Sequence, residues 1–358
     1  MTVKGMSWYM AATFVGAVVG AGFASGHEAL TFFNTYGIWG LIGIGIVTVG
    51  FVSMGACNFT LAQTTAHGSY RHILEITCGT KGARYYDVIV TCFLLAGVGV
   101  MLAGAGSLAT QQWGLPFLVG VLGTALVVGL SAYVGIGGVL WVNAVLVPGI
   151  ILFTMSLGII GLVRLWPSLT EVGIDAFWKA LPSPLVPKWW MAAFTYLSYN
   201  SLLGIAACIP LAASLSNRKS ALWGGVLGGM LLGLLILANT LAIWGAGSAA
   251  VDNPVPMAWI TTDVHPLLGD CYAIIIWSAM VTTAATNLFA VTKRLGRESQ
   301  LSTIVGLLIL ALALSFTGFS ALIGLLYPVF GYLGCLYVLQ TLIYFVRRWL
   351  RRLQNKRP

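Results

Sequence analysis

The sequence predicts an all-α integral membrane protein with ten transmembrane helices in a 5+5 inverted repeat, in which helices 1 and 6 are broken at mid-membrane. Three observations support this fold class. Hydrophobic residues make up 59% of the 358 residues and charged residues only 8%, which is more apolar surface than a soluble domain of this size buries. Apolar segments recur along the whole chain. Two of them carry polar interruptions at corresponding depths.

The apolar segments number ten. A helix needs about 20 apolar residues to cross the hydrocarbon core of a bilayer. The segments run over approximately 7–35, 38–65, 86–110, 115–134, 138–163, 188–214, 221–246, 266–292, 302–317 and 320–346. We expect them to form a single transmembrane domain over 1–358, with a first repeat at about 7–163 and a second at about 188–346.

The basic residues lie between the apolar segments and after the last one. If the N-terminus is cytoplasmic, the cytoplasmic side holds fifteen of the 18 lysines and arginines, and the outer side holds Arg164, Lys179 and Lys188. Cytoplasmic loops of membrane proteins carry this excess, so we predict that both termini are cytoplasmic. The net charge of +9 then reflects topology and contact with anionic headgroups of the lipid bilayer, and we expect no nucleic-acid partner.

The first span is interrupted in its middle by the run 16–28 (GAVVGAGFASGHE). Irregular backbone at membrane depth persists only where protein covers it or where it lines a cavity. A break here leaves carbonyls at the end of the inner half, near Val18 to Gly20, and amides at the start of the outer half, near Phe23 to Gly26, where an anion is favoured. We therefore expect this break to bind substrate through Gly20, Ala21, Gly22, Phe23, Ala24, Ser25 and Glu28.

The polar residues of this run leave alternatives open. Glu28 pairs with a substrate amine, carries a coupled proton, or forms a structural hydrogen bond to the sixth or tenth span. His27 is of a type that titrates near neutral pH, although a lone histidine is more often a satisfied hydrogen-bond partner. The glycines either let a ligand approach the backbone or simply let helices pack closely.

The sixth span begins like the first. Residues 189–195 (WWMAAFT) match residues 8–14 (WYMAATF), and a polar interruption at 198–201 (SYNS) follows at similar depth. Five spans separate the two, so they cross the membrane in opposite directions. Paired interruptions of this kind indicate an inverted-repeat transporter and its binding site. We add Tyr199, Asn200 and Ser201 to the expected substrate site, with carbonyls near Tyr199 that suit a cation or an ammonium group.

This arrangement resembles the leucine-transporter (LeuT) fold of the amino acid–polyamine–organocation superfamily. Within it, the run 19–28 (VGAGFASGHE) is similar to the signature of the YkvI-like bacterial membrane proteins, and 198–200 and 327–334 are similar to other recurrent segments of that group. The resemblance covers essentially the whole chain. It implies a multi-pass protein of the bacterial cytoplasmic (inner) membrane that moves a small-molecule substrate by alternating access, and it names no cargo.

The resemblance also implies a Na⁺ site between the eighth and first spans. Its ligands would be Ala279, Thr282 and Thr283 from the eighth span and the carbonyls of Gly16 and Val19 from the first. Sodium is a hard cation that takes oxygen ligands, so uncharged carbonyls and hydroxyls suit it. The alternative is that the threonines bond back to carbonyls of their own helix. The fifth span contains no lysine, which replaces this sodium in some proton-coupled members of the superfamily.

We therefore expect a sodium-coupled secondary active transporter of a small organic solute, an amino acid or an amine. An amino acid would place its carboxylate at the amides of the first span, whereas a Glu28 that faces the cavity favours a cationic amine. The alternative is a proton-coupled carrier or exchanger of the same fold, an exporter included, that uses Glu28. The sequence has no nucleophile-and-base constellation, HExxH motif or phosphate loop, so we expect no enzyme. Both a monomer and a homodimer stay open.

Overall fold

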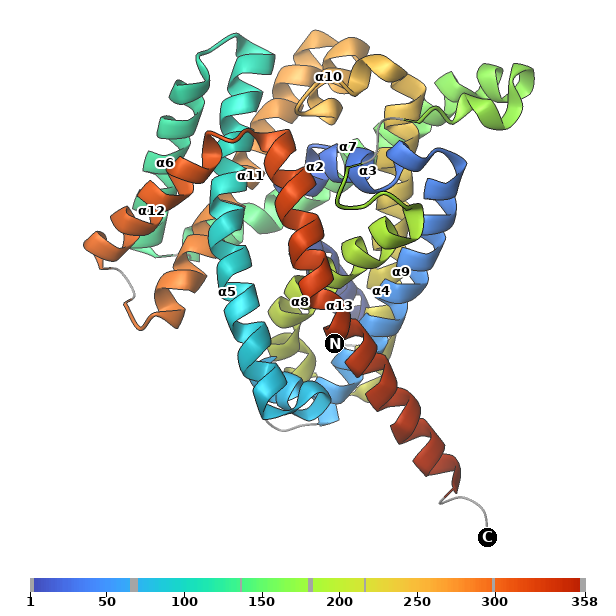
Figure 1. Cartoon of the computed structure of the whole chain (residues 1–358), viewed down its shortest axis with the longest axis vertical. Coiled ribbons are helices and arrows are strands. Elements are labelled where there is room, and N and C mark those ends of the chain that lie inside the picture. The colour runs from blue at the N-terminus through green and yellow to red at the C-terminus, as the bar shows by residue number, and fades with distance from the viewer. Residues whose placement is uncertain are drawn as a thin grey trace.

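Every regular element in the described part of the chain is a helix (Figure 1). The computed structural model describes residues 3–64, 70–135, 137–179, 183–215, 217–297 and 300–354. The helices follow in this order: α1 (Val3–Val18), α2 (Ala21–Ala24), α3 (His27–Phe32), the 3₁₀ turn η1 (Asn34–Tyr36), α4 (Ile38–Thr64), α5 (Tyr70–Trp113), α6 (Phe117–Val134), α7 (Gly137–Glu171), the 3₁₀ turn η2 (Gly173–Ala176), α8 (Trp189–Ser214), α9 (Arg218–Ala246), the 3₁₀ turn η3 (Ser248–Ala250), α10 (Pro256–Val264), α11 (Pro266–Arg294), α12 (Leu301–Ser315) and α13 (Phe319–Gln354). Helices pair their backbone groups within one segment, which is what a hydrocarbon environment demands.

Most of these helices are long and apolar enough to cross a bilayer. Among the described residues, seven pass this test by length and composition: α4, α5, α6, α7, α9, α11 and α13. The bent helix α8 makes eight if its two parts count as one span. The helices α1 and α12 have 16 and 15 residues and are shorter than a typical span. The structure confirms an all-helical membrane protein, and the count of ten spans and the inverted repeat stay predictions.

The central helices pack closely because α9 carries glycines at four-residue spacing. A methyl group at Gly225 would lie 2.3 Å from the carbonyl carbon of Gly55, and one at Gly229 would lie 2.4 Å from the amide nitrogen of Val52. Both of these contacts are with the backbone of α4. Small residues at this spacing let two membrane helices approach until their backbones touch. The helix α9 also packs against α1 and α7, so it lies at the centre of this half of the molecule.

The other half is built around α5 and α11. These two helices pack against each other, and α6 and α12 cover them on the side away from α4 and α9 (Figure 1). The broken segment lies between the halves, because α2 contacts α11 whereas α3 contacts α8, α9 and α13. This position puts the interruption of the first span inside protein, as irregular backbone at membrane depth requires.

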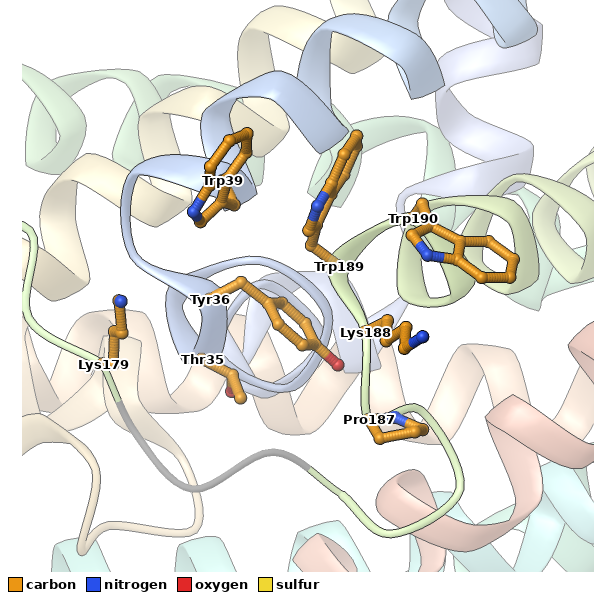
Figure 2. A pocket seen from close by; sticks show the side chains of 8 residues that line it. All are labelled: Thr35, Tyr36, Trp39, Lys179, Pro187, Lys188, Trp189 and Trp190. Atoms are coloured by element: carbon orange, nitrogen blue, oxygen red, sulfur yellow. The ribbon is translucent and has the colours of Figure 1, made fainter.

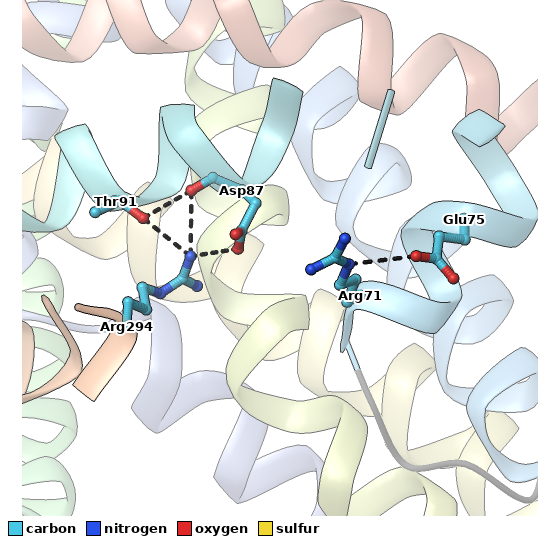
Figure 3. A network of polar contacts seen from close by, with 5 residues as sticks. All are labelled: Arg71, Glu75, Asp87, Thr91 and Arg294. Carbon is cyan, nitrogen blue, oxygen red and sulfur yellow. Dashed lines mark hydrogen bonds and ion pairs between the residues drawn. The ribbon is translucent and has the colours of Figure 1, made fainter. Parts of the chain in front are cut away.

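One polar network links α5 to the end of α11 (Figure 3). The guanidinium of Arg294 donates to the Asp87 carboxylate at 2.6 Å and to the Thr91 hydroxyl at 3.1 Å. A second ion pair, Arg71 to Glu75 at 3.3 Å, lies within the first turns of α5. Both pairs are partly exposed, so neither forms a buried site; the first joins the end of α11 to α5, and the second lies within α5.

The sixth span is interrupted, as expected, but the interruption lies after Gly204 and not at 198–201. The helix α8 is continuous through these residues and bends by 55° farther along, between its parts Trp189–Gly204 and Ala207–Ser214. Two of the four polar side chains at 198–201 bond within their own helix, since Ser198 Oγ donates to the Phe194 carbonyl at 2.7 Å and Asn200 Nδ2 to the Tyr196 carbonyl at 3.1 Å. Such back-bonding lets polar residues remain helical in an apolar segment.

Candidate functional site

The first span is broken at Val19 and Gly20, where the sequence predicts it. In a continuous α-helix the Gly20 amide would donate to the Gly16 carbonyl. Instead it donates to the Val18 carbonyl at 2.9 Å, with Gly20 itself extended (φ −96°, ψ −171°). The Gly16 carbonyl therefore loses its helical donor, and α1 ends at Val18.

A second interruption follows one turn later, at Ser25 and Gly26. Gly26 adopts a left-handed conformation (φ 79°) that redirects the chain into α3. The Ser25 hydroxyl joins the two short helices, because it donates to the Gly22 carbonyl at 2.6 Å and accepts from the His27 amide at 3.2 Å. The run 16–28 thus contains two separate changes of direction within one span.

Three helices distant in sequence donate hydrogen bonds to the carbonyls of Phe23, Ala24 and Ser25, at the end of α2. Asn239 Nδ2 from α9 donates to the Phe23 carbonyl at 3.2 Å, and the Tyr272 hydroxyl from α11 donates to the Ala24 carbonyl at 2.9 Å. The Met257 amide from α10 donates to the Ser25 carbonyl at 3.0 Å. The carbonyls of these predicted substrate residues are therefore bound to protein. Sequence reasoning missed all three donors, and only Asn239, a polar residue in an apolar span, gave a signal.

The Glu28 carboxylate lies beside Gly22, between the two interruptions of the first span. Its side chain is 6% exposed, and its Oε2 accepts a hydrogen bond from the Tyr199 hydroxyl at 2.9 Å. A methyl group at Gly22 would lie 2.3 Å from Glu28 Oε1 and 3.1 Å from the Tyr327 hydroxyl. The structure therefore brings together three of the predicted residues, Gly22, Glu28 and Tyr199. The hydrogen bond to the sixth span, one of the three roles open for Glu28, is present.

Aromatic rings pack around Tyr199, whose hydroxyl binds this carboxylate. We call Phe32, Phe93, Tyr196, Tyr199 and Tyr327 the aromatic cluster. The ring centroid of Tyr199 lies 5.0 Å from Tyr327, 5.5 Å from Tyr196, and 5.9 Å from both Phe93 and Phe32. The rings come from α3, α5, α8 and α13, so the cluster exists only in the folded chain. The sequence singled out only Tyr199, and the helical spacing of Tyr196 and Tyr199 is the local signal that could have identified a second member.

The other predicted residues of the sixth span differ in their surroundings. Asn200 bonds to its own helix, as described above. The Ser201 hydroxyl is fully buried and has no hydrogen-bond partner within the described residues. Ser201 lies one turn before Gly204, where a methyl group would lie 2.6 Å from the Val18 side chain. Residues three apart share a helix face, so Ser201 lies on the side of α8 that faces the end of α1.

His27 points elsewhere. Its ring lies 5.8 Å from the Phe319 ring, and its Nδ1 is buried without a hydrogen-bond partner in the described part of the chain. Adjacent residues of a helix point in directions about 100° apart. His27 is therefore not a partner of the Glu28 carboxylate.

Comparisons with known proteins identify relatives over the whole chain. YkvI of Bacillus subtilis (strain 168), an uncharacterized membrane protein, is 28% identical over 341 residues, which cover 94% of this chain and 95% of that protein. YyaD of the same organism is 25% identical over 343 residues, with coverage of 95% and 96%. No family model matches the chain. The predicted resemblance to the YkvI-like proteins is confirmed.

Two solved structures share the architecture. Mhp1, a nucleobase-cation-symport-1 family transporter in a closed conformation with bromovinylhydantoin bound, has a TM-score of 0.57 at 12% identity and covers 86% of this chain and 70% of its own. MhsT in complex with L-phenylalanine has a TM-score of 0.56 at 16% identity, with coverage of 94% and 97%. The chain has the LeuT-type fold. At these identities the likeness concerns the fold alone.

The residues expected to hold sodium in the LeuT-type fold are only partly brought together. Thr283 Oγ1 lies 3.7 Å from the position of a methyl group at Gly20, so it faces the break. The Thr282 hydroxyl instead donates to the Ala279 carbonyl at 3.1 Å, which is the back-bonding alternative. The Val19 amide keeps its helical hydrogen bond to the Val15 carbonyl at 2.7 Å, and the Val19 carbonyl lies at the break.

A separate pocket of about 340 Å³ lies where η1 and the starts of α4 and α8 meet (Figure 2). Its lining consists of Thr35, Tyr36, Trp39, Lys179, Pro187, Lys188, Trp189 and Trp190. The rings of Trp39 and Trp189 stack with centroids 5.9 Å apart, and the Tyr36 hydroxyl donates to the Val186 carbonyl. None of the predicted site residues lines this pocket, so it is distinct from the broken segment.

Proposed function

We propose that this chain is a secondary active transporter that moves a small organic solute across the bacterial cytoplasmic membrane by alternating access, coupled to sodium. The observation that carries the proposal is the double interruption of the first span, which lies inside the protein with a buried carboxylate over it. Interrupted helices at membrane depth are where transporters of inverted-repeat architecture bind their substrates. The LeuT-type neighbours support it, because the names of Mhp1 and MhsT describe a small organic molecule bound to each.

Sodium coupling is supported by the oxygen atoms around the break. The Gly16 carbonyl has lost its helical donor, and the Thr283 hydroxyl faces Gly20. Uncharged oxygens of this kind suit a hard monovalent cation. The bound cation would bridge α1 and α11, and so stabilise one arrangement of the two halves relative to the other.

The hydrogen bonds that fix α2 to its neighbours suggest how the site responds when these helices move relative to one another. The donors Asn239, Tyr272 and Met257 come from α9, α11 and α10. A rearrangement that separates these helices would remove donors from buried carbonyls, which is unfavourable unless water or solute replaces them. Opening of the site and release of the broken segment are therefore coupled in this proposal.

The test is solute uptake into proteoliposomes that contain the purified protein. We expect at least one member of a panel of amino acids and amines to accumulate when an inward sodium gradient is imposed, and not when potassium replaces sodium. Accumulation of no panel member under either a sodium or a proton gradient would refute the transport function.

The double substitution Thr282→Ala with Thr283→Ala tests the sodium site. We expect it to abolish the sodium dependence of uptake or of solute-induced stabilisation, because both hydroxyl ligands are lost. Thr292→Ala is the matched control, since Thr292 is a buried threonine of the same helix that bonds back to the Phe289 carbonyl at 2.9 Å. Sodium dependence that is unchanged in the double variant would rule this site out.

A proton-coupled carrier or exchanger is the second candidate, and the isolation of Glu28 favours it. Among the described residues the ion pairs are Arg71–Glu75, Arg164–Asp263 and Arg294–Asp87, and none of them includes Glu28. A buried carboxylate without a basic partner is a chemically suitable proton carrier. In that case Glu28→Gln would abolish uptake driven by a proton gradient and retain exchange of labelled for unlabelled solute.

A further inference from the structure

The break of the first span already contains a carboxylate that belongs to the chain. Glu28 Oε1 occupies the space beside Gly22, and Oε2 is held by the Tyr199 hydroxyl. A solute carboxylate placed at the break would share this space with Glu28. Two carboxylates at such separation repel each other, and neither finds a basic side chain here, because the ion pairs of the described residues lie elsewhere.

The surroundings of Glu28 suit a positive charge instead. Within the described residues the carboxylate has no ion-pair partner. The Tyr199 hydroxyl binds it, and the Tyr199 ring packs against Tyr327 and Phe93, with centroid distances of 5.0 Å and 5.9 Å. The faces of aromatic rings attract cations, and most strongly where water is excluded. An ammonium group can also replace the Tyr199 hydroxyl as the hydrogen-bond donor to Oε2.

We propose that the solute is an organic amine without a carboxylate, whose ammonium group pairs with Glu28 and contacts the rings of Tyr199 and Tyr327. Because Glu28 Oε1 lies beside Gly22, the carboxylate of an amino acid at the break would meet a second carboxylate, which excludes amino acids. The inference deepens the proposed function and rests on it, because it assigns a solute class to the same break.

Matched pairs of ligands test this assignment on the purified full-length protein. In each pair the amine is the amino acid without its carboxylate. The pairs are ethylamine with alanine, isobutylamine with valine, isoamylamine with leucine, and phenethylamine with phenylalanine. A ligand that binds the native state raises the unfolding temperature in a saturable manner. We expect at least one amine to do so in sodium buffer, with its amino acid partner at least tenfold weaker. Equal or tighter binding by the amino acid of each responding pair, or stabilisation by none of the amines, would overturn the inference.

Two substitutions connect the effect to the carboxylate. Glu28→Gln keeps an oxygen that accepts from Tyr199 and removes the charge, and we expect at least a tenfold loss of amine affinity. Gly22→Ala is a second route for the case in which Glu28→Gln fails to fold, because its methyl group would lie 2.3 Å from Oε1 and displace the carboxylate. The control is Glu75→Gln, which neutralises the carboxylate that pairs with Arg71. Unchanged amine affinity in the folded Glu28→Gln or Gly22→Ala protein would contradict the assignment.

The outcomes separate this inference from the transport function. Binding and sodium-driven uptake of an amino acid would refute the amine class and leave the transporter intact. Saturable amine binding without uptake under any imposed gradient would refute transport and leave the amine site intact.

Discussion

Gly26 is the position where the broken span is most sensitive to substitution. It adopts φ 79°, in the left-handed region, at the junction between α2 and α3. A methyl group there would lie 2.6 Å from Met257 Cγ, well inside an ordinary carbon–carbon contact. Met257 cannot easily withdraw, because its amide donates to the Ser25 carbonyl at 3.0 Å. We therefore predict that Gly26→Ala strongly destabilises the protein.

The expected magnitude has two parts. A residue with a side chain costs roughly 1–2 kcal/mol in the left-handed conformation. The clash with Met257 adds an overpacking cost of roughly 1–3 kcal/mol. Together, these effects should reduce the free energy of unfolding by about 2–5 kcal/mol.

The measurement is the unfolding temperature of the purified variants in detergent, with denaturant unfolding where it is reversible. Gly20→Ala is the matched control from the same break. Its backbone is extended, and its methyl group would lie 3.7 Å from Thr283 Oγ1, an ordinary contact, so we expect a change within about 0.5 kcal/mol. A Gly26→Ala protein as stable as the wild type, or an equal loss in both variants, would refute this reasoning.

Two further predictions concern the hydrogen bonds around the site and at the helix ends. Tyr272→Phe should reduce the free energy of unfolding by about 1–3 kcal/mol, because it removes the donor at 2.9 Å from the buried Ala24 carbonyl. Thermal unfolding beside the exposed control Tyr133→Phe measures this, and equal stabilities would contradict it. Asp87→Asn should lower stability by only about 0.2–1 kcal/mol, and less in high salt, because its ion pair with Arg294 is partly exposed. A loss far above this range in the same assay would show that the ion pair has a larger structural role.

The prediction of the first break was correct because its signals are local. Glycines and ionisable residues within an apolar run are visible without any knowledge of the fold, and the structure ends α1 at Val18 and turns at Gly20. The same reasoning placed the interruption of the sixth span too early, because α8 bends by 55° between Gly204 and Ala207. Ser198 and Asn200 bond to carbonyls one turn earlier in α8, so their polarity does not interrupt the helix. A polar run predicts a break only when its side chains find no partner within the helix.

The tertiary contacts of the site have no local signal. The donors to the carbonyls of Phe23 and Ala24 are 216 and 248 residues away in the chain. The aromatic cluster combines four helices, and Tyr199 was the member that the sequence singled out. The three possible roles of Glu28 could be listed from its position in a span, but only the fold placed its carboxylate over Gly22 and against Tyr199.

The sequence alone therefore determined the class of protein and the position of the first break, because hydrophobicity, helix length and backbone freedom depend on neighbouring residues. The tertiary structure decided which groups satisfy the broken backbone and what surrounds Glu28. Those contacts join helices that are distant in sequence, and helix packing, rather than any local preference, brings them within hydrogen-bonding distance.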